Sequence, residues 1–505
     1  MKESITYGYN KIKNYKIPII VGFIVALLAH TFMFANKLIN HDDIYYLFGK
    51  GATVSSGRWG LELLSSVFPD FSLPWINGII STCLMITSAC VACSIFKIKN
   101  KWLQALVVGN FIAFPSLTAT YIYMFTASSY AVAFLLSVIA VKLFISEKWW
   151  HKIISAVCMM FMFGIYQAYI SITATLFLLY VIQQFIKEEK KPAKIIINAF
   201  MFLGVMIVAL IGYYVISLLA QKLFNVELNS YATGALSATT SIMERVKLAY
   251  KEFKQILTTN AYGIIPFKFS RLIHIVCIGV AAIKLFLIWC KKNVWAKIFL
   301  PVLFLLLPLS INCMFLASST STIHTLVLHG FCMTYLVFAV IVDEDIEYKS
   351  KIISLVKKCS NKIVSLALCL IVIANIYVAN EVYLCLHLKY ENAFAYYTSV
   401  VTTIKNTPGF DENSKLALIG NKNNLEHQHN EFHEIRRIIG TFDITHVYSN
   451  YEFVQRYIGF DMPKASNEEI NRIVASEEYK NMPEYPYYGS VKAIDDIIVV
   501  KFGNQ

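Results

Sequence analysis

Charged residues are scarce in this sequence. Only 15% of its 505 residues are Asp, Glu, Lys or Arg, whereas 57% are hydrophobic. Soluble domains carry about 25% charged residues. Several long stretches have no charge at all: residues 17–36, 75–96, 102–119, 195–219 and 298–316. Because about 18 consecutive apolar residues can cross a bilayer, the sequence predicts an integral membrane protein.

Other absences narrow the class further. No glycine-rich phosphate-binding loop appears, which argues against an ATP-driven pump. No internal repeat stands out, whereas many transporters are built from inverted repeats. No small-residue cleavage site follows the first apolar run, so we expect a retained first span. None of the eleven cysteines lies after Cys385, and the Cys90–Cys93 pair falls within an apolar run, where packing is the favoured role.

The basic residues indicate topology rather than nucleic-acid binding. The net charge is +13, but the lysines form short clusters between apolar runs, at residues 11–16, 97–101, 187–194, 291–297 and 349–362. Such clusters are typical of cytoplasmic loops. We therefore expect about eleven crossings with the N-terminus in the cytoplasm. This parity requires two short helices within residues 153–186, joined by an exterior turn at 164–169.

The chain divides into two predicted domains. Residues 1–385 form an all-α polytopic membrane domain with exterior loops at 37–74 and 220–270, the second holding an amphipathic helix over Ser241–Leu257. The last four spans are expected at 272–290, 298–316, 323–342 and 363–385. Residues 386–505 are polar and predict a small exterior α/β domain. Its strands are expected at 416–419 and 497–500, and its helices at 431–439 and 467–475.

The first exterior loop carries the strongest candidates for chemistry. Asp42 and Asp43 directly follow the first span, and Arg58 and Trp59 stand together further along. The two carboxylates either cap a short helix or supply a base. Neighbouring helical residues diverge by about 100°, so the pair is not expected to act on one atom. Arg58 either pairs with a lipid headgroup or binds the phosphate of a substrate. Trp59 either lies at the membrane–water interface or lines a substrate site.

Further polar residues are expected near the same face. Lys268 and Arg271 lie where the eighth span begins, and His324 is expected at the start of the tenth span, with His329 deeper. The two histidines are five residues apart and point to different helix faces, which argues against a shared metal. The alternative for both histidines is a structural role in packing. The candidate substrate-lining residues are His41, Trp59, Tyr166, Gln167 and His329.

Four short motifs resemble bacterial membrane glucosyltransferases of the glucosyltransferase II type, within the GT-C class. They are the acidic pair after the first span, Ser-Gly-Arg-Trp at 56–59, Gly-Ile-Tyr-Gln-Ala-Tyr at 164–169, and Tyr-Tyr-Gly-Ser-Val at 487–491. The resemblance implies a sugar donor on a polyprenyl phosphate and a cell-surface glycan, such as an O-antigen, as acceptor. It also implies a multi-pass protein of the bacterial cytoplasmic membrane, with residues 386–505 outside.

The resemblance assigns roles to the candidates. Asp42 or Asp43 would deprotonate an acceptor hydroxyl, which attacks the anomeric carbon with inversion. Arg58, with Lys268 or Arg271, would hold the leaving phosphate. Where some relatives have an arginine in span ten, this chain has His324 and His329.

We expect Asp43→Asn, and to a lesser degree Asp42→Asn, to abolish sugar transfer. No cofactor is implied with certainty, and a divalent cation at Asp42 and Asp43 stays open. A transporter or flippase for lipid-linked glycans is the alternative from another class.

Overall fold

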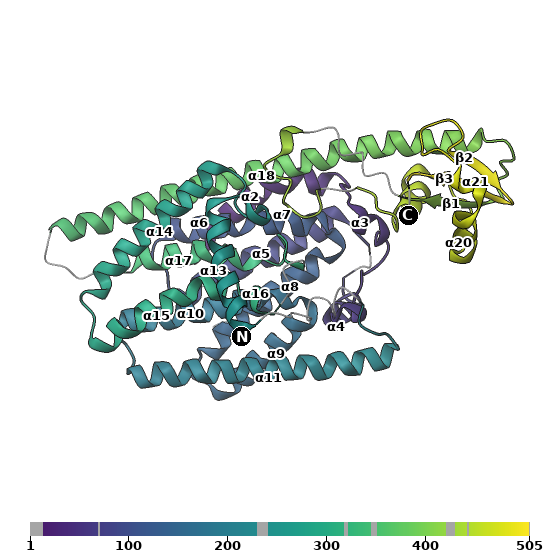
Figure 1. Ribbon diagram of the computed structural model, residues 1–505. Coiled ribbons are helices and arrows are strands. Elements are labelled where there is room, and N and C mark those ends of the chain that lie inside the picture. The colour runs from purple at the N-terminus through teal and green to yellow at the C-terminus, as the bar shows by residue number, and fades with distance from the viewer. Residues whose placement is uncertain are drawn as a thin grey trace, which may run out of the picture.

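The protein is a helical bundle with a small sheet beyond one end (Figure 1). The computed structural model describes residues 14–68, 71–229, 241–317, 322–344, 351–420, 430–441 and 444–503. Within these ranges, nine helical stretches are long and apolar enough to cross a membrane. The structure therefore confirms a helical, multi-pass membrane protein with a small C-terminal sheet.

The first half of the bundle contains closely packed, largely buried helices. α2 (Lys16–Ala35) packs on α5 (Pro74–Phe96) and on α6 (Lys101–Ile112). The side chain of Asn100 caps α6, and Pro115 begins α7 (Pro115–Ile122), because proline at a first helical position has no amide hydrogen to leave unpaired. α8 (Met124–Phe144) then packs on α5.

Residues 153–186 contain two helices, as the basic clusters predict. α9 (Trp149–Ile165) and α10 (Ile170–Lys187) are joined by the short helix η2 (Gln167–Tyr169). α9 is shorter than the nine stretches above. It packs between α8 and the long helix α11 (Pro192–Phe224).

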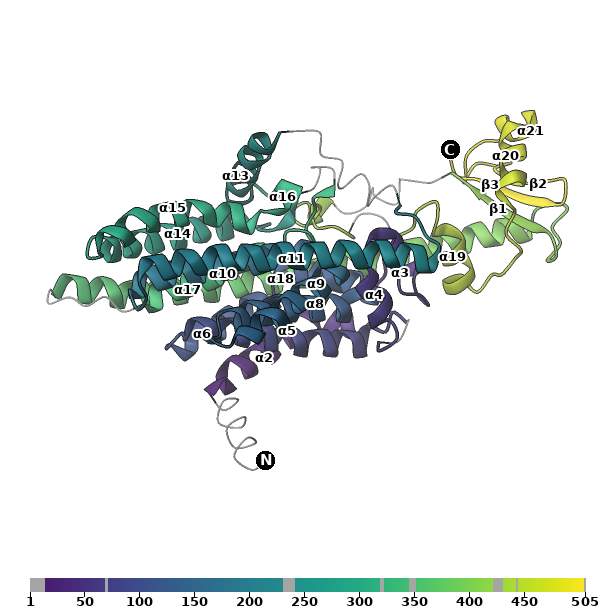
Figure 2. The same ribbon diagram turned by 90° about the horizontal axis from the view of Figure 1, so that it is seen from below.

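The second half of the bundle is more open. The predicted amphipathic helix is α13 (Ile242–Thr258), which begins at a capping box formed by Ser241 and Glu244. It lies on the outside of the bundle with α16 (Met314–Ala317), next to α15 (Val294–Ile311) (Figure 2). α14 (Lys268–Trp289) and α17 (Met333–Asp343) both pack on α18 (Lys351–Lys405). α18 continues well past the predicted span end at residue 385.

Two predicted helices are shorter than expected. The expected span 323–342 becomes helical only at η5 (His329–Cys332), so His324 lies in irregular chain just before the turn at 325–328. The expected helix 431–439 has only η7 (Asn430–Phe432) followed by turns. Both segments are held in irregular form by Thr325, whose hydroxyl donates to the Tyr262 carbonyl (2.6 Å) and accepts from the Ile439 amide (3.1 Å).

The C-terminal sheet confirms both predicted strands and adds a third. Its order is β1 (Lys415–Ile419), β3 (Ile497–Lys501), β2 (Val491–Ile494). β3 runs parallel to β1 and antiparallel to β2, and every residue of this central strand is buried. The connection from β1 to β2 carries α19 (Asn450–Phe453), α20 (Asn467–Ala475) and α21 (Glu477–Lys480), and α20 matches its prediction.

Thr325→Val should release residues 435–441 from the bundle. The valine keeps the shape but leaves the partly buried Ile439 amide without its acceptor, a change of about 1–3 kcal/mol. Hydrogen exchange at residues 435–441 should therefore accelerate. The control Thr402→Val removes only a hydroxyl that bonds to its own helix at Thr398, and should leave this exchange unchanged. Unchanged exchange in Thr325→Val would contradict this account.

Candidate active site

The acidic pair lies on α3 (His41–Tyr45), directly after the first span. Asn40 caps this helix, since its side chain accepts from the amide of Asp43 at 2.9 Å. The capping role that the sequence left open for the aspartates is thus filled by their neighbour. Asp42 and Asp43 occupy the first turn, where carboxylates favour the helix dipole, and their side chains enter different surroundings.

Asp43 is a buried structural residue. Its side chain is 0% exposed and forms an ion pair with Lys37. Its other oxygen accepts from the hydroxyl of Ser72 at 2.5 Å. These contacts tie α3 to the end of α2 and to the chain just before α5, so Asp43 fixes the position of the helix that carries Asp42.

Asp42 lines a cavity instead. Its carboxylate accepts a hydrogen bond of 2.5 Å from the Tyr448 hydroxyl, which comes from the C-terminal part of the chain. Burial and this bond raise the pKa of Tyr448, so the phenol stays protonated and remains a donor. Arg456 donates to the carbonyls of Ile44 and Tyr45 at 2.6 and 3.0 Å, which secures the end of α3 from the same side.

The cavity has a volume of about 360 Å³ and brings together residues from most of the chain. Its polar and charged lining includes carboxylate, guanidinium, ammonium, imidazole and phenol groups. These residues are His41, Asp42, Tyr46, Lys50, Ser56, Arg58, Tyr123, Thr126, Tyr130, Tyr166, Asn229 and His324. A negative group and several cationic or hydrogen-bonding groups therefore face one space.

Arg58 enters this cavity from a tight loop. The helix η1 (Val54–Ser56) ends at Gly57, whose φ of 71° lies in the left-handed region that glycine adopts without strain. Arg58 then donates to the Tyr130 hydroxyl at 3.1 Å, and its guanidinium lies 5.4 Å from the ring centroid of Tyr166. Tyr130 and Tyr166 stack on each other at 4.3 Å. The two tyrosines thus hold the guanidinium against the cavity wall.

The turn between α9 and α10 holds the Gly57–Arg58 loop in place through hydrogen bonds and packing. Gln167 donates to the Gly57 carbonyl at 3.0 Å, and the Tyr213 hydroxyl donates to the same carbonyl at 3.0 Å. Trp59, which begins α4 (Trp59–Leu64), packs directly on Gly164. A Cβ on Gly164 would lie 2.5 Å from the Trp59 ring. Two of the motifs behind the family resemblance therefore form one packed unit.

The structure brings together five predicted site residues and separates the others. His41, Asp42, Arg58, Tyr166 and His324 line the cavity.

The remaining six contact other parts of the fold. Asp43, Trp59 and Gln167 do not line the cavity but hold the segments that carry its lining residues. His329 is 1% exposed and lies 3.3 Å from the Tyr169 hydroxyl. Lys268 begins α14 outside the lining, and Arg271 donates to the carbonyls of Ile265 and Pro266.

Seven polar lining residues were not among the predicted site residues: Tyr46, Lys50, Ser56, Tyr123, Thr126, Tyr130 and Asn229. Lys50 donates to Glu62 at 2.6 Å; burial acts to raise the pKa of that carboxyl, but hydrogen bonds from Lys50 and Thr53 outweigh it and the pKa is lowered. Lys50 lies in the first exterior loop predicted from the sequence, so its charge could have marked it as a candidate site residue. Tyr130 and Asn229 carried no such signal.

The described residues contain no group of three or more His, Cys, Asp or Glu side chains arranged to hold a metal ion. Asp42 and Asp43 do not share one binding space, because Asp43 faces Lys37 and Asp42 faces the cavity.

Gly164→Ala should destabilise the protein by displacing Trp59. Overpacking of this kind typically lowers stability by about 1–3 kcal/mol, which should appear as a lower Tm of the purified protein. Gly279→Ala is the matched control, because no atom lies within 4 Å of its added Cβ. Adding Trp59→Leu to Gly164→Ala should recover part of the loss. Equal Tm values for both alanine variants would refute this packing argument.

Comparison with known proteins identifies the family of this chain. Residues 31–342, more than half of the chain, match the family described as glucosyl transferase GtrII. The matched region contains every polar residue of the cavity lining. No curated protein and no solved structure matches the chain. The resemblance seen in the sequence is confirmed, and the chain belongs to the GtrII family of membrane glucosyltransferases.

Proposed function

We propose that the protein transfers a glucosyl residue from a polyprenyl-phosphate donor to a surface glycan, with inversion at the anomeric carbon. The observation that carries the proposal is that Asp42 and Arg58 line the same cavity. Transfer from a lipid phosphate needs both an acceptor for a proton and a cation for the leaving phosphate. This cavity offers the Asp42 carboxylate and two cations, Arg58 and Lys50, beside hydrogen-bonding side chains suited to a sugar.

The reaction follows from these positions. The Asp42 carboxylate accepts the proton of the acceptor hydroxyl, whose oxygen forms a bond to the anomeric carbon. The bond from that carbon to the phosphate oxygen breaks, and its electron pair leaves with the phosphate. Arg58 stabilises this developing charge, with His324 as a further hydrogen-bonding group. Lys268 and Arg271 have no part in the proposal, because they do not line the cavity.

The proposal puts the cavity at the exterior face of the bacterial cytoplasmic membrane, in a GT-C-like arrangement. The lysine clusters at 97–99, 187 and 291–292 meet at the end of the bundle opposite the sheet (Figure 1). Clusters of this kind favour the cytoplasmic side. The cavity and the C-terminal domain would then lie outside, where a lipid-linked donor and a surface acceptor can meet.

Asp42→Asn should abolish most transfer while the fold is kept. General-base catalysis contributes about 10²–10⁴-fold, so kcat should fall by that factor with an unchanged Tm. The assay supplies glucosyl polyprenyl phosphate and acceptor glycan to the purified protein and measures free polyprenyl phosphate. Asp43→Asn should instead lower Tm, because it removes the charge opposite Lys37. This reverses the order expected from the sequence.

Two outcomes of this assay would count against the proposal. Full transfer by Asp42→Asn would eliminate Asp42 as the base. Movement of the intact donor across a vesicle membrane, with no lipid phosphate released, would favour the flippase alternative.

Arg58→Gln should lower kcat by roughly 10²–10³-fold, the usual range when one electrostatic stabiliser is lost. Arg58→Lys should retain more activity, because it keeps the charge but loses the fork that reaches Tyr130. Arg472→Gln is the control, since Arg472 pairs with Asp495 on the surface of the C-terminal domain. Equal kcat in Arg58→Gln and Arg472→Gln would remove Arg58 from the mechanism.

A further inference from the structure

A second cavity lies at the lysine-rich end of the bundle, far from Asp42. It has a volume of about 650 Å³ and is formed by the α5–α6 turn and the ends of α10, α14 and α17. Its charged lining consists of five lysines and three carboxylates: Lys97, Lys99, Lys187, Lys291, Lys292, Glu189, Asp343 and Glu344. Cytoplasmic loops attract lysines in any membrane protein. The enclosure of these lysines around one space is a separate feature.

Two of the three carboxylates of this cavity already accept hydrogen bonds from other parts of the chain. Asp343 accepts from the backbone amides of Lys99 and Asn100 at 2.6 and 3.2 Å. Glu344 accepts from Gln183 at 2.6 Å and lies 3.7 Å from Lys187. Lys292 also lies 3.7 Å from Glu188, at the edge of the cavity. Five lysines against these four carboxylates leave the cavity net positive, which suits an anion such as a phosphate.

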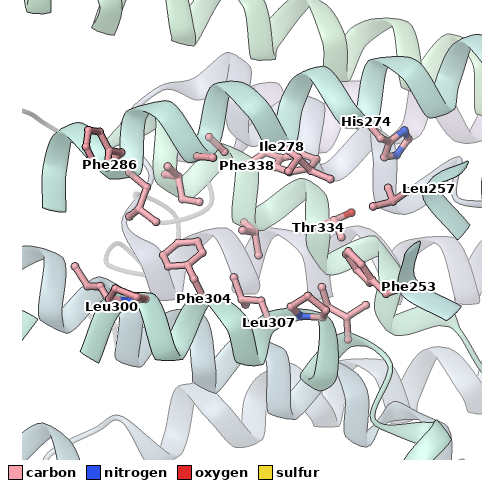
Figure 3. A pocket seen from close by; sticks show the side chains of 18 of the residues that line it. Phe253, Leu257, His274, Ile278, Phe286, Leu300, Phe304, Leu307, Thr334 and Phe338 are labelled. Atoms are coloured by element: carbon pink, nitrogen blue, oxygen red, sulfur yellow. The ribbon is translucent and has the colours of Figure 1, made fainter. Parts of the chain in front are cut away.

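An apolar cleft adjoins this basic cavity along the same helices. It has a volume of about 490 Å³ and lies between α14 and α15, with α17 as its floor. Figure 3 shows Ile278 and Phe286 on one wall, Phe304 and Leu307 on the other, and Phe253 near one end. α14 packs on α17 and α18, whereas α15 packs mainly on α10, so the two walls stand apart.

Successive turns of α14 and α17 connect the two spaces. On α14, Ala281 and Leu285 line the cleft, and Ile288 and Lys292 continue the same stripe into the basic cavity. From His274 to Trp289 the cleft follows α14 for roughly 22 Å, at 1.5 Å per residue. The buried Lys284 donates to the Val342 carbonyl, which fixes α14 against α17.

We infer that this pair of spaces binds a phospholipid with an anionic headgroup. The phosphate would lie among the lysines of the basic cavity, and an acyl chain would extend along the cleft between α14 and α15. The cleft is open to the bilayer: Ala282 on its edge is exposed, and the neighbouring Ile283 is 60% exposed. The site is distinct from the Asp42 cavity and does not depend on the proposed reaction.

The test uses a phosphatidylglycerol that carries a photoactivatable diazirine in its acyl chain. The full-length protein is reconstituted in phosphatidylcholine vesicles with this lipid, and the labelled residues are mapped by mass spectrometry. Labelling should fall on the cleft walls of α14, α15 and α17. Unlabelled phosphatidylglycerol should compete, whereas phosphatidylcholine should not.

Two variants separate the headgroup from the chain. Lys97→Gln with Lys291→Gln should reduce cleft labelling about tenfold, because each basic residue near an anionic headgroup adds substantially to binding. Lys148→Gln is its control, because Lys148 lies outside the cavity, against Trp150. Ala282→Phe should block the cleft, whereas Ile283→Phe, which faces lipid, should not.

Three results would overturn the inference. The first is equal labelling in the double lysine variant and in Lys148→Gln. The second is labelling of the cleft by a neutral phosphatidylcholine analogue at the same level. The third is complete competition by inorganic phosphate, which would assign the basic cavity to a free anion. The variants are compared only after they elute as the same species as the unmodified protein.

Discussion

The contact between Trp59 and Gly164 is the constraint on which the cavity depends. The indole occupies the space that a Cβ at Gly164 would fill, so the loop before α4 can approach the turn between α9 and α10. At that distance Gln167 reaches the Gly57 carbonyl and Tyr166 lies beneath the Arg58 guanidinium. A long, flexible arginine is therefore held by its surroundings, which favours recognition of a fixed group over attraction of any anion.

A comparable division of roles separates the two aspartates. They are adjacent in the sequence and chemically identical, yet one secures α3 through Lys37 and the other faces the cavity. The divergence of about 100° per residue in a helix makes such a split unavoidable. The hydrogen bond from Tyr448 then orients the exposed carboxylate without neutralising it, because the phenol keeps its proton.

Much of this arrangement follows from the sequence, and the failures have physical causes. Uncharged runs predicted the membrane helices, and short continuous apolar runs predicted β1 and β3, because burial alone dictates these patterns. The motif residues predicted Asp42, Arg58 and Tyr166 at one site. Periodicity misjudged 323–328 and 431–439, since both segments form short turns instead of a helix, and the Ile439 amide bonds to the Thr325 hydroxyl. Tyr448 was out of reach because its partner lies 406 residues away.

The continuity of α18 has a mechanical consequence. Its 55 residues contain neither proline nor glycine, so no position along it favours a kink. The 20 residues beyond the predicted span end correspond to roughly 30 Å of rod, at 1.5 Å per residue. The sheet is therefore carried on a stiff spacer rather than a tether, while the chain that follows returns to place Tyr448 on Asp42. The length of this helix therefore sets the distance between the C-terminal sheet and the apolar helical bundle.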